Sequence, residues 1–184
     1  SEMCIRDRYY DALSEWDHDL STLSTPGQIK ATARMAFQQQ AWLLGIHASS
    51  LIPHGGDWRQ GYVLPYADEI SGAANQTGLR RAFLAGLIRQ ESGFAFGIRS
   101  DVGAQGLMQV MPATAEWLQS HIPAAADADL HSIRGNLVLG SNYLSLQQQS
   151  FGGSELLAAA AYNAGPGAPK RWLGRWDGPT PGPG

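Results

Sequence analysis

The sequence predicts an all-α fold, with at most a trivial hairpin. Apolar residues recur at the three- and four-residue spacing of amphipathic helices along most of the chain. No run of alternating β-branched residues reaches the length of a useful strand. With 184 residues, 43% of them hydrophobic and 16% charged, the chain is long enough to bury a core. We therefore expect a helical domain preceded by a shorter helical extension.

The extension is predicted to cover residues 9–62. Apolar residues at helical spacing predict two helices within residues 9–50, and the pattern breaks at Pro26-Gly27. A stretch rich in proline and glycine at residues 53–65 then interrupts the helical pattern. We place the boundary between the extension and the second part of the chain in this stretch.

Both ends of the chain are set apart from the fold prediction. Residues 1–8 read SEMCIRDR, which resembles translated sequencing-adapter sequence, and we expect them to be a non-native leader. This leader contains Cys4, the only cysteine, so no intramolecular disulfide is expected. Residues 177–184 consist mainly of proline and glycine, and we expect a flexible tail there.

Five helices are predicted within residues 63–176, with turn residues between neighbouring helices. Pro112 suits the first position of a helix, Ser154 suits an N-cap, and Gly165 suits a C-terminal cap. The predicted helices span about residues 66–76, 79–93, 112–121, 135–149 and 154–164.

Composition argues against several classes of function. The formal net charge is −3 and lysine and arginine form no block, so a nucleic-acid partner is not expected. No segment approaches the roughly 20 apolar residues of a membrane span. The histidines lack the spacing of metal ligands, and we expect neither a metal nor a cofactor.

Glu91 lies at the end of the predicted helix 79–93, on its apolar face. Leu84, Leu87 and Ile88 form one apolar stripe. The carboxyl group continues this stripe, because it follows those residues at positions seven, four and three. Loss of hydration there would raise the pKa of the carboxyl group and let it act as a general acid near neutrality. The alternative is that Glu91 pairs with an arginine or a backbone amide and only closes the helix.

A glycine-rich turn follows this helix. Gly103 and Gly106 free the backbone to turn, which brings the amide of Gln109 beside Met108 and Met111. One amide and two thioethers could line a groove. The alternative is ordinary core filling by the methionines and a loop-capping role for the amide.

Tyr162 and Asn163 end a run of small residues just before Gly165. Because they lie where the helix ends, their phenol and amide groups could point into the same cavity as Glu91. Taken alone, a tyrosine at a helix end is more often a half-buried anchor.

Together, these segments resemble the soluble lytic transglycosylase family. Its marks are a Glu-Ser pair that closes a helix, a Gly-Leu-Met-Gln turn and an Ala-Tyr-Asn-Ala-Gly helix end. They match residues 91–92, 106–109 and 161–165, and the resemblance covers about residues 63–176. It extends to Met111-Pro112 and to a helix that carries Asn136, Gly140, Tyr143 and Leu144.

The resemblance implies a lysozyme-like α fold with a groove for a glycan strand, and residues 9–62 would be the end of a preceding helical superstructure. Two departures from the family pattern stand out. Asp101 occupies a position where proline is common. A family element of the pattern Pro-Phe-x-Glu-Thr-Arg-x-Tyr does not follow within the chain, and we expect the groove to lack one wall there.

The resemblance further implies a single catalytic acid and base, Glu91. It would cut peptidoglycan between N-acetylmuramic acid and N-acetylglucosamine without water, leaving 1,6-anhydro ends. The sugar would be bound by Ser92, Gln109, Met111, Tyr162 and Asn163, with Gly106, Leu107 and Met108 supporting the turn. We expect none of the other acidic candidates, Asp68, Glu69, Asp101 and Glu116, to be catalytic. Trp117 or Trp172 could stack on the sugar as Met111 would, but we expect both tryptophans to pack in the core.

Two other functions stay open. A goose-type lysozyme or related muramidase would share the fold but release a reducing sugar by hydrolysis. A non-catalytic module that only binds peptidoglycan would not need a buried acid. On the transglycosylase interpretation we expect a periplasmic monomer whose signal sequence lies upstream of the residues given.

Overall fold

The computed structural model describes residues 2–52, 62–175 and 178, and this part of the chain confirms the all-α prediction. Within it, strand-like pairing is limited to isolated bridges from Gln105 to Arg99 and to Val110. The stretch 53–61 and most of the predicted tail 177–184 lie outside the described residues. None of the described helices is long and apolar enough to cross a membrane.

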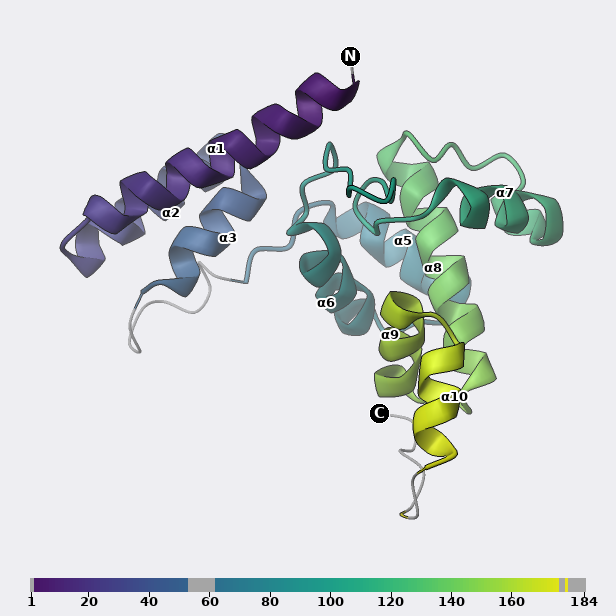
Figure 1. The fold of residues 1–184 in the computed structure, drawn as a ribbon. Helices are drawn as coiled ribbons and strands as arrows, with labels where there is room; N and C mark the ends of the chain where they lie inside the picture. Colours follow the sequence, from purple (N-terminus) through teal and green to yellow (C-terminus); the bar gives the residue numbers. More distant parts are fainter. Residues whose placement is uncertain (1, 53–61, 176–177, 179–184) are drawn as a thin grey trace.

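The extension contains three helices within the described residues, and the prediction of two was wrong. They are α1 (Glu2–Thr22), α2 (Pro26–Gln38) and α3 (Trp42–Ser50), shown in purple and blue in Figure 1. The additional break lies between α2 and α3, where Gln40 has a φ of 57° and cannot continue a right-handed helix. Nothing in the residue pattern marks this turn, because glutamine is a good helix former.

α1 begins at Glu2, so most of the predicted leader continues directly into this helix. Its non-native origin therefore stays a prediction. The start of α2 is fixed by a capping box: the Thr25 hydroxyl accepts from the Gln28 amide at 3.3 Å, and the Gln28 side chain accepts from the Thr25 amide at 3.1 Å.

The second part contains the five predicted helices, with ends that differ from the prediction by no more than a few residues. The Pro112, Ser154 and Gly165 caps are confirmed. The helices are α5 (Ala67–Thr77), α6 (Arg81–Ser92), α7 (Pro112–His121), α8 (Ile133–Ser150) and α9 (Glu155–Ala164), together with a 3-10 turn η1 (Pro123–Ala125) and a further helix α10 (Gly167–Leu173). The seven residues of α10 are too few for a periodic pattern, which is why it was not predicted.

α8 forms the centre of this part and packs against α5, α7 and α9 (Figure 1). Its residues Leu137, Leu139 and Leu144 are almost completely buried. Leu84 and Ile88 of α6 are completely buried in the same core. The helix that carries Glu91 is therefore anchored by its apolar face to the core.

The extension is joined to this core through α3. Ile46 belongs to the main core, and Trp42 packs against it. Leu43 lies directly on Gly93, because a Cβ atom built on that glycine would come within 2.3 Å of Leu43 Cδ1. The last helix of the extension therefore supports the end of α6.

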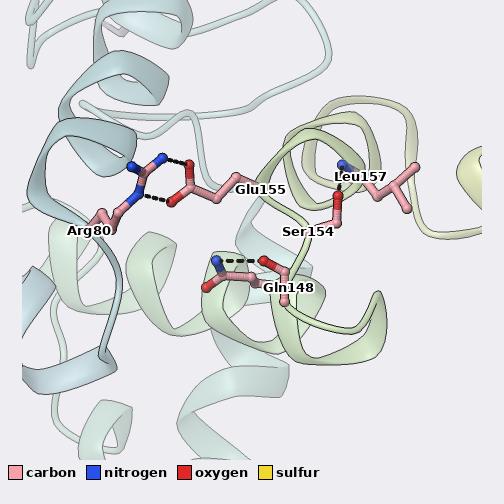
Figure 2. Close-up of polar contacts among 6 residues, drawn as sticks. Arg80, Gln148, Ser154, Glu155 and Leu157 are labelled. Carbon is pink, nitrogen blue, oxygen red and sulfur yellow. Dashed lines mark hydrogen bonds and ion pairs between the residues drawn. The ribbon is translucent and has the colours of Figure 1, made fainter. Parts of the chain in front are cut away.

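A bidentate ion pair between Arg80 and Glu155 joins the start of α6 to the start of α9 (Figure 2). Nε of Arg80 donates to Glu155 at 2.6 Å, and a second guanidinium nitrogen donates to the other carboxylate oxygen. Next to it, the Ser154 hydroxyl accepts from the Leu157 amide at 3.4 Å and caps α9. The two helices that carry the predicted site residues are thus tied together at their N-terminal ends.

Candidate active site

Glu91 lies in the last turn of α6, half-buried beside Leu87 and Ile88. Its Oε1 atom is buried and has no hydrogen-bond partner among the described residues. This burial raises the pKa of the Glu91 carboxyl group above its ordinary value. Raising the pKa favours the protonated form, which is the form that a general acid uses.

The end of α6 is closed by Gly93 and not by Glu91. Gly93 adopts the left-handed conformation with a φ of 54°, and its amide donates to the Arg89 carbonyl at 3.0 Å. Gly93 therefore supplies the cap of α6, and the Oε1 atom of Glu91 takes no part in it.

Ser92 joins the end of α6 to the glycine-rich turn. Its side chain is only 3% exposed. The hydroxyl group lies 2.8 Å from the Leu107 carbonyl and 3.2 Å from the Ile88 carbonyl, and it donates toward these main-chain oxygens. Ser92 thus contacts the protein backbone, and direct binding of a substrate by this residue stays a prediction.

The turn itself is built on two left-handed residues, Gly106 with a φ of 77° and Gln109 with a φ of 47°. The Gln109 side-chain amide donates to the carbonyls of Gly106 at 2.9 Å and Ile98 at 3.2 Å. These bonds correspond to the loop-capping alternative. Met108 is completely buried, as core filling would have it, whereas Met111 is 38% exposed at the start of α7.

Tyr162, near the end of α9, reaches the same turn. Its hydroxyl group donates to the Met108 carbonyl at 2.7 Å. Its pKa lies well above the ordinary value, first because of burial and then because of the nearby negative charges of Glu91 and Tyr143. Glu91 and Tyr162 therefore lie close enough to interact electrostatically, and their sharing of one cavity stays a prediction.

Tyr143 of α8 completes this group, and its contribution was not predicted from the residue pattern. Its ring centroid lies 5.4 Å from that of Tyr162, with the rings inclined by 60°. Burial raises the pKa of Tyr143 as well. The only signal for it in the sequence was its place in the helix that resembles the family. Asn163 is exposed at the end of α9, so its contact with a sugar stays a prediction.

The expectation that the two tryptophans pack in the core was wrong. Trp117 is 47% exposed and Trp172 is 53% exposed. Trp117 lies on the face of α7 opposite the buried Ala115, and its ring stacks on His121 at 4.7 Å. The other acidic candidates are all exposed: Asp68, Glu69, Asp101 and Glu116.

Two pockets formed by described residues lie elsewhere. They have volumes of about 390 and 310 Å³ and adjoin one another between α5, η1 and α8, with Gln76, Arg134 and Val138 lining both. Neither is lined by Glu91 or its neighbours. The described residues also contain no group of three side chains suited to hold a metal ion.

Fold and site together define a lysozyme-like α domain in which a half-buried glutamate, Glu91, lies at the end of a helix with one buried, unpartnered oxygen. The model of the family described as "Transglycosylase SLT domain" matches residues 68–178. The chain belongs to this SLT transglycosylase family.

Relatives with known names agree with this assignment. The soluble lytic murein transglycosylase of Escherichia coli K12 is 32% identical over 166 residues, which cover 89% of this chain and 26% of that protein. The protein of the same name from Salmonella typhimurium is 33% identical over the same shares. The chain thus spans about a quarter of the length of these relatives.

Solved structures show the same fold. An inactive mutant of the lytic transglycosylase Slt from Pseudomonas aeruginosa has a TM-score of 0.77 and 33% identity, covering 94% of this chain and 28% of that one. The 70 kDa soluble lytic transglycosylase of Escherichia coli has a TM-score of 0.76 and 30% identity, covering 94% and 29%. The matched part includes nearly all of this chain, so it takes in the extension as well as the second part.

Proposed function

We propose that this chain is the catalytic part of a peptidoglycan lytic transglycosylase. It would cut the β-1,4 bond between N-acetylmuramic acid and N-acetylglucosamine without water and leave 1,6-anhydro ends. The observation that carries the proposal is the buried, unpartnered Oε1 of Glu91 in a chain of the SLT family. Burial raises the pKa of this carboxyl group, which favours the protonated form that a general acid uses, and its Oε1 atom has no hydrogen-bond partner among the described residues.

The proposed reaction is the one that the resemblance implies for a single catalytic acid, and Glu91 is the acidic residue whose buried oxygen has no hydrogen-bond partner among the described residues. Glycoside hydrolases normally use two carboxyl groups. Here Glu91 protonates the glycosidic oxygen as the bond to C1 of the muramic acid breaks, and the substrate's acetamido group stabilises the cation. The substrate's own C6 hydroxyl then forms the new bond to C1 and returns its proton to Glu91. Because this attack is intramolecular, it gains the advantage of proximity without a second protein carboxylate.

The other predicted site residues fall into two groups in this proposal. Met111 and Asn163 are exposed and would contact the sugar directly. Ser92, Gln109 and Tyr162 donate hydrogen bonds to main-chain carbonyls, and we infer that they shape the surroundings of the carboxyl group.

The test is mass spectrometry of the products formed from purified peptidoglycan by the chain and two variants. We expect anhydro-muropeptides from the parent chain and a rate at least roughly 10²-fold lower from Glu91→Gln, the usual scale for loss of general acid catalysis. Glu116→Gln is the matched control, because this glutamate is exposed on α7, and it should not change the rate.

Each other outcome points to one alternative. Reducing-end products would make the protein a muramidase that uses water. Peptidoglycan binding without products from any of the three proteins would make it a binding module. A Glu91→Gln variant as active as the parent would remove Glu91 from the mechanism.

We also propose that the protein acts in the periplasm as a monomer, with no nucleic-acid partner and no cofactor. The support for the location is the proposed substrate, since peptidoglycan lies outside the cytoplasmic membrane. Cell fractionation and size-exclusion chromatography with light scattering test the two statements, and a cytoplasmic protein or a stable dimer would contradict them.

A further inference from the structure

The glycine-rich turn receives one hydrogen bond from each of the two helices that carry the site. The Ser92 hydroxyl, at the end of α6, contacts the Leu107 carbonyl at 2.8 Å, and the Tyr162 hydroxyl, near the end of α9, donates to the Met108 carbonyl at 2.7 Å. Both acceptors are main-chain oxygens of adjacent residues. The position of the turn's backbone therefore determines where Ser92, the neighbour of Glu91, and Tyr162 lie.

Asn136 of α8 holds this backbone from the core side. Its side chain is completely buried. Oδ1 accepts from the Met108 amide at 2.9 Å, and Nδ2 donates to the Gln105 carbonyl at 2.9 Å and the Leu130 carbonyl at 3.3 Å. All three bonds go to loop backbone, so this side chain fixes two points of the turn and one of the loop before α8.

One peptide group is held at both of its ends. The Leu107 carbonyl and the Met108 amide belong to the same planar trans unit, so they point in opposite directions. Ser92 binds the carbonyl end and Asn136 binds the amide end. This single rigid unit therefore links α8 to the end of α6, and each bond polarises the other.

Gly106 is matched to this asparagine. A Cβ atom at this position would come within 2.3 Å of Asn136 Nδ2, and the φ of 77° is one that side chains rarely adopt. The glycine is therefore required both for the backbone conformation and for the close approach of the asparagine side chain.

We propose that Asn136 is a positioning residue for the reaction: through the Leu107–Met108 peptide group it holds the end of α6, which carries Glu91, against the turn that Tyr162 also binds. The catalytic meaning of this statement rests on the proposed function. Without the asparagine side chain, the Met108 amide and the Gln105 carbonyl lose buried partners, and the turn must relax to find others. Water then reaches the Glu91 carboxyl group, which is close enough to Tyr162 of α9 to raise the pKa of its phenol. The Tyr162 ring in turn packs against Tyr143 of α8.

The first experiment needs no substrate. The ionisation of Glu91 is followed by NMR of the side-chain carboxyl carbons in chain labelled with 13C-glutamate, with the signal assigned by its loss in Glu91→Gln. We expect Asn136→Ala to lower the Glu91 pKa toward its ordinary value, because burial is what raises it.

Ser145→Ala is the matched control. Ser145 is a buried polar residue of the same helix, 8% exposed, and its hydroxyl donates to the Thr77 carbonyl of α5 at 3.0 Å. The variant loses a buried interhelical bond but leaves the turn alone. We expect it to keep the Glu91 titration of the parent.

A double-mutant cycle with Gly106→Ala tests the contact itself. Gly106→Ala should lower the Glu91 pKa as Asn136→Ala does. The combined variant should lower it by less than the sum of the two single changes, because the clash disappears with the asparagine side chain while the backbone strain at position 106 remains. If these variants do not fold, Ser92→Ala is the substitute, because it removes the hydrogen bond to the Leu107 carbonyl, the other end of the Leu107–Met108 peptide group. Alanine is tolerated in a helix, and this variant should also lower the Glu91 pKa.

Turnover of peptidoglycan completes the test. For folded Asn136→Ala we expect kcat to fall roughly 10- to 100-fold, the scale of small displacements from a reactive geometry, with little change in KM. A folded Asn136→Ala chain with the parent's Glu91 titration and kcat would overturn the proposal, and so would an equal pKa shift in Ser145→Ala. Reducing-end products, or none, from the parent chain would overturn the proposed function, whereas the titration would still decide the role of Asn136.

Discussion

Gly93 is the position where we expect packing between the extension and α6 to affect stability most. Gly93→Ala adds a single methyl group directly after the Glu91-Ser92 pair. The residue has a φ of 54°, and the new Cβ would lie 2.3 Å from Leu43 Cδ1 and 3.1 Å from Leu43 Cβ. The substitution therefore meets two separate penalties, one in the backbone and one in packing.

Their magnitudes can be estimated separately. Holding alanine in the left-handed conformation costs roughly 1–2 kcal/mol. Forcing an extra methyl group into a packed contact costs roughly 1–3 kcal/mol. Gly93→Ala should therefore lower the free energy of unfolding by about 2–5 kcal/mol, the sum of the two terms. Gly78→Ala is the matched control: Gly78 also closes a helix with a φ of 72°, but nothing lies within 4 Å of its Cβ position, so only the backbone penalty applies.

The assay is urea denaturation of the whole chain, extended to a double-mutant cycle with Leu43→Ala. In the Leu43→Ala background the contact with Cδ1 is gone and only the 3.1 Å approach to Cβ remains, so the cost of Gly93→Ala should fall toward that of Gly78→Ala. A Gly93→Ala chain as stable as Gly78→Ala, or an equal cost in both backgrounds, would refute the idea that α3 presses on the end of α6.

Three further predictions concern single side chains. Tyr162→Phe leaves the Met108 carbonyl without its donor and should cost about 1–3 kcal/mol in urea denaturation; unchanged stability would argue against the bond. Burial raises the pKa of Glu91 in the folded chain above its ordinary value in the unfolded chain. As the pH rises between these two pKa values, the unfolded chain ionises first, so the free energy of unfolding falls and stays lower at higher pH. Glu91→Gln should therefore be more stable than the parent at about pH 7 and equal to it at about pH 3, and a constant difference between the two pH values would contradict this. Ser154→Ala removes the N-cap of α9 and should lower the free energy of unfolding by about 1 kcal/mol in thermal or urea denaturation. Unchanged stability would mean that the bond from the Leu157 amide to the Ser154 hydroxyl does not stabilise the helix.

The sequence was sufficient where the relevant signal is local. Helical periodicity predicts five of the helices that follow the linker, and the stripe of Leu84 and Ile88 predicts that Glu91 faces the interior. Caps such as Ser154 depend only on residues three positions away, and this one lies where it was predicted.

The rest depends on contacts between distant segments. The bond from Asn136 to Met108 joins residues 28 positions apart, and no periodic pattern encodes it. The contact of Leu43 with Gly93 is of the same kind, and the predicted helix 79–93 included this glycine without any sign of the contact. Trp117 was misjudged because large aromatic residues are usually buried, whereas its helix leaves that face to solvent.

The long-range bond between Tyr162 and Met108 has a consequence for the order in which the protein matures. It joins residues 54 positions apart, and the ion pair that ties α9 to α6 joins residues 75 positions apart. Contacts of this range form late in folding, because the entropy of closing a long loop is lost first. Glu91 is synthesised well before α9, so until that helix docks, Tyr162 does not yet bind the turn beside it. On the proposed function, we therefore expect the newly made chain to be inactive until its last helices have docked.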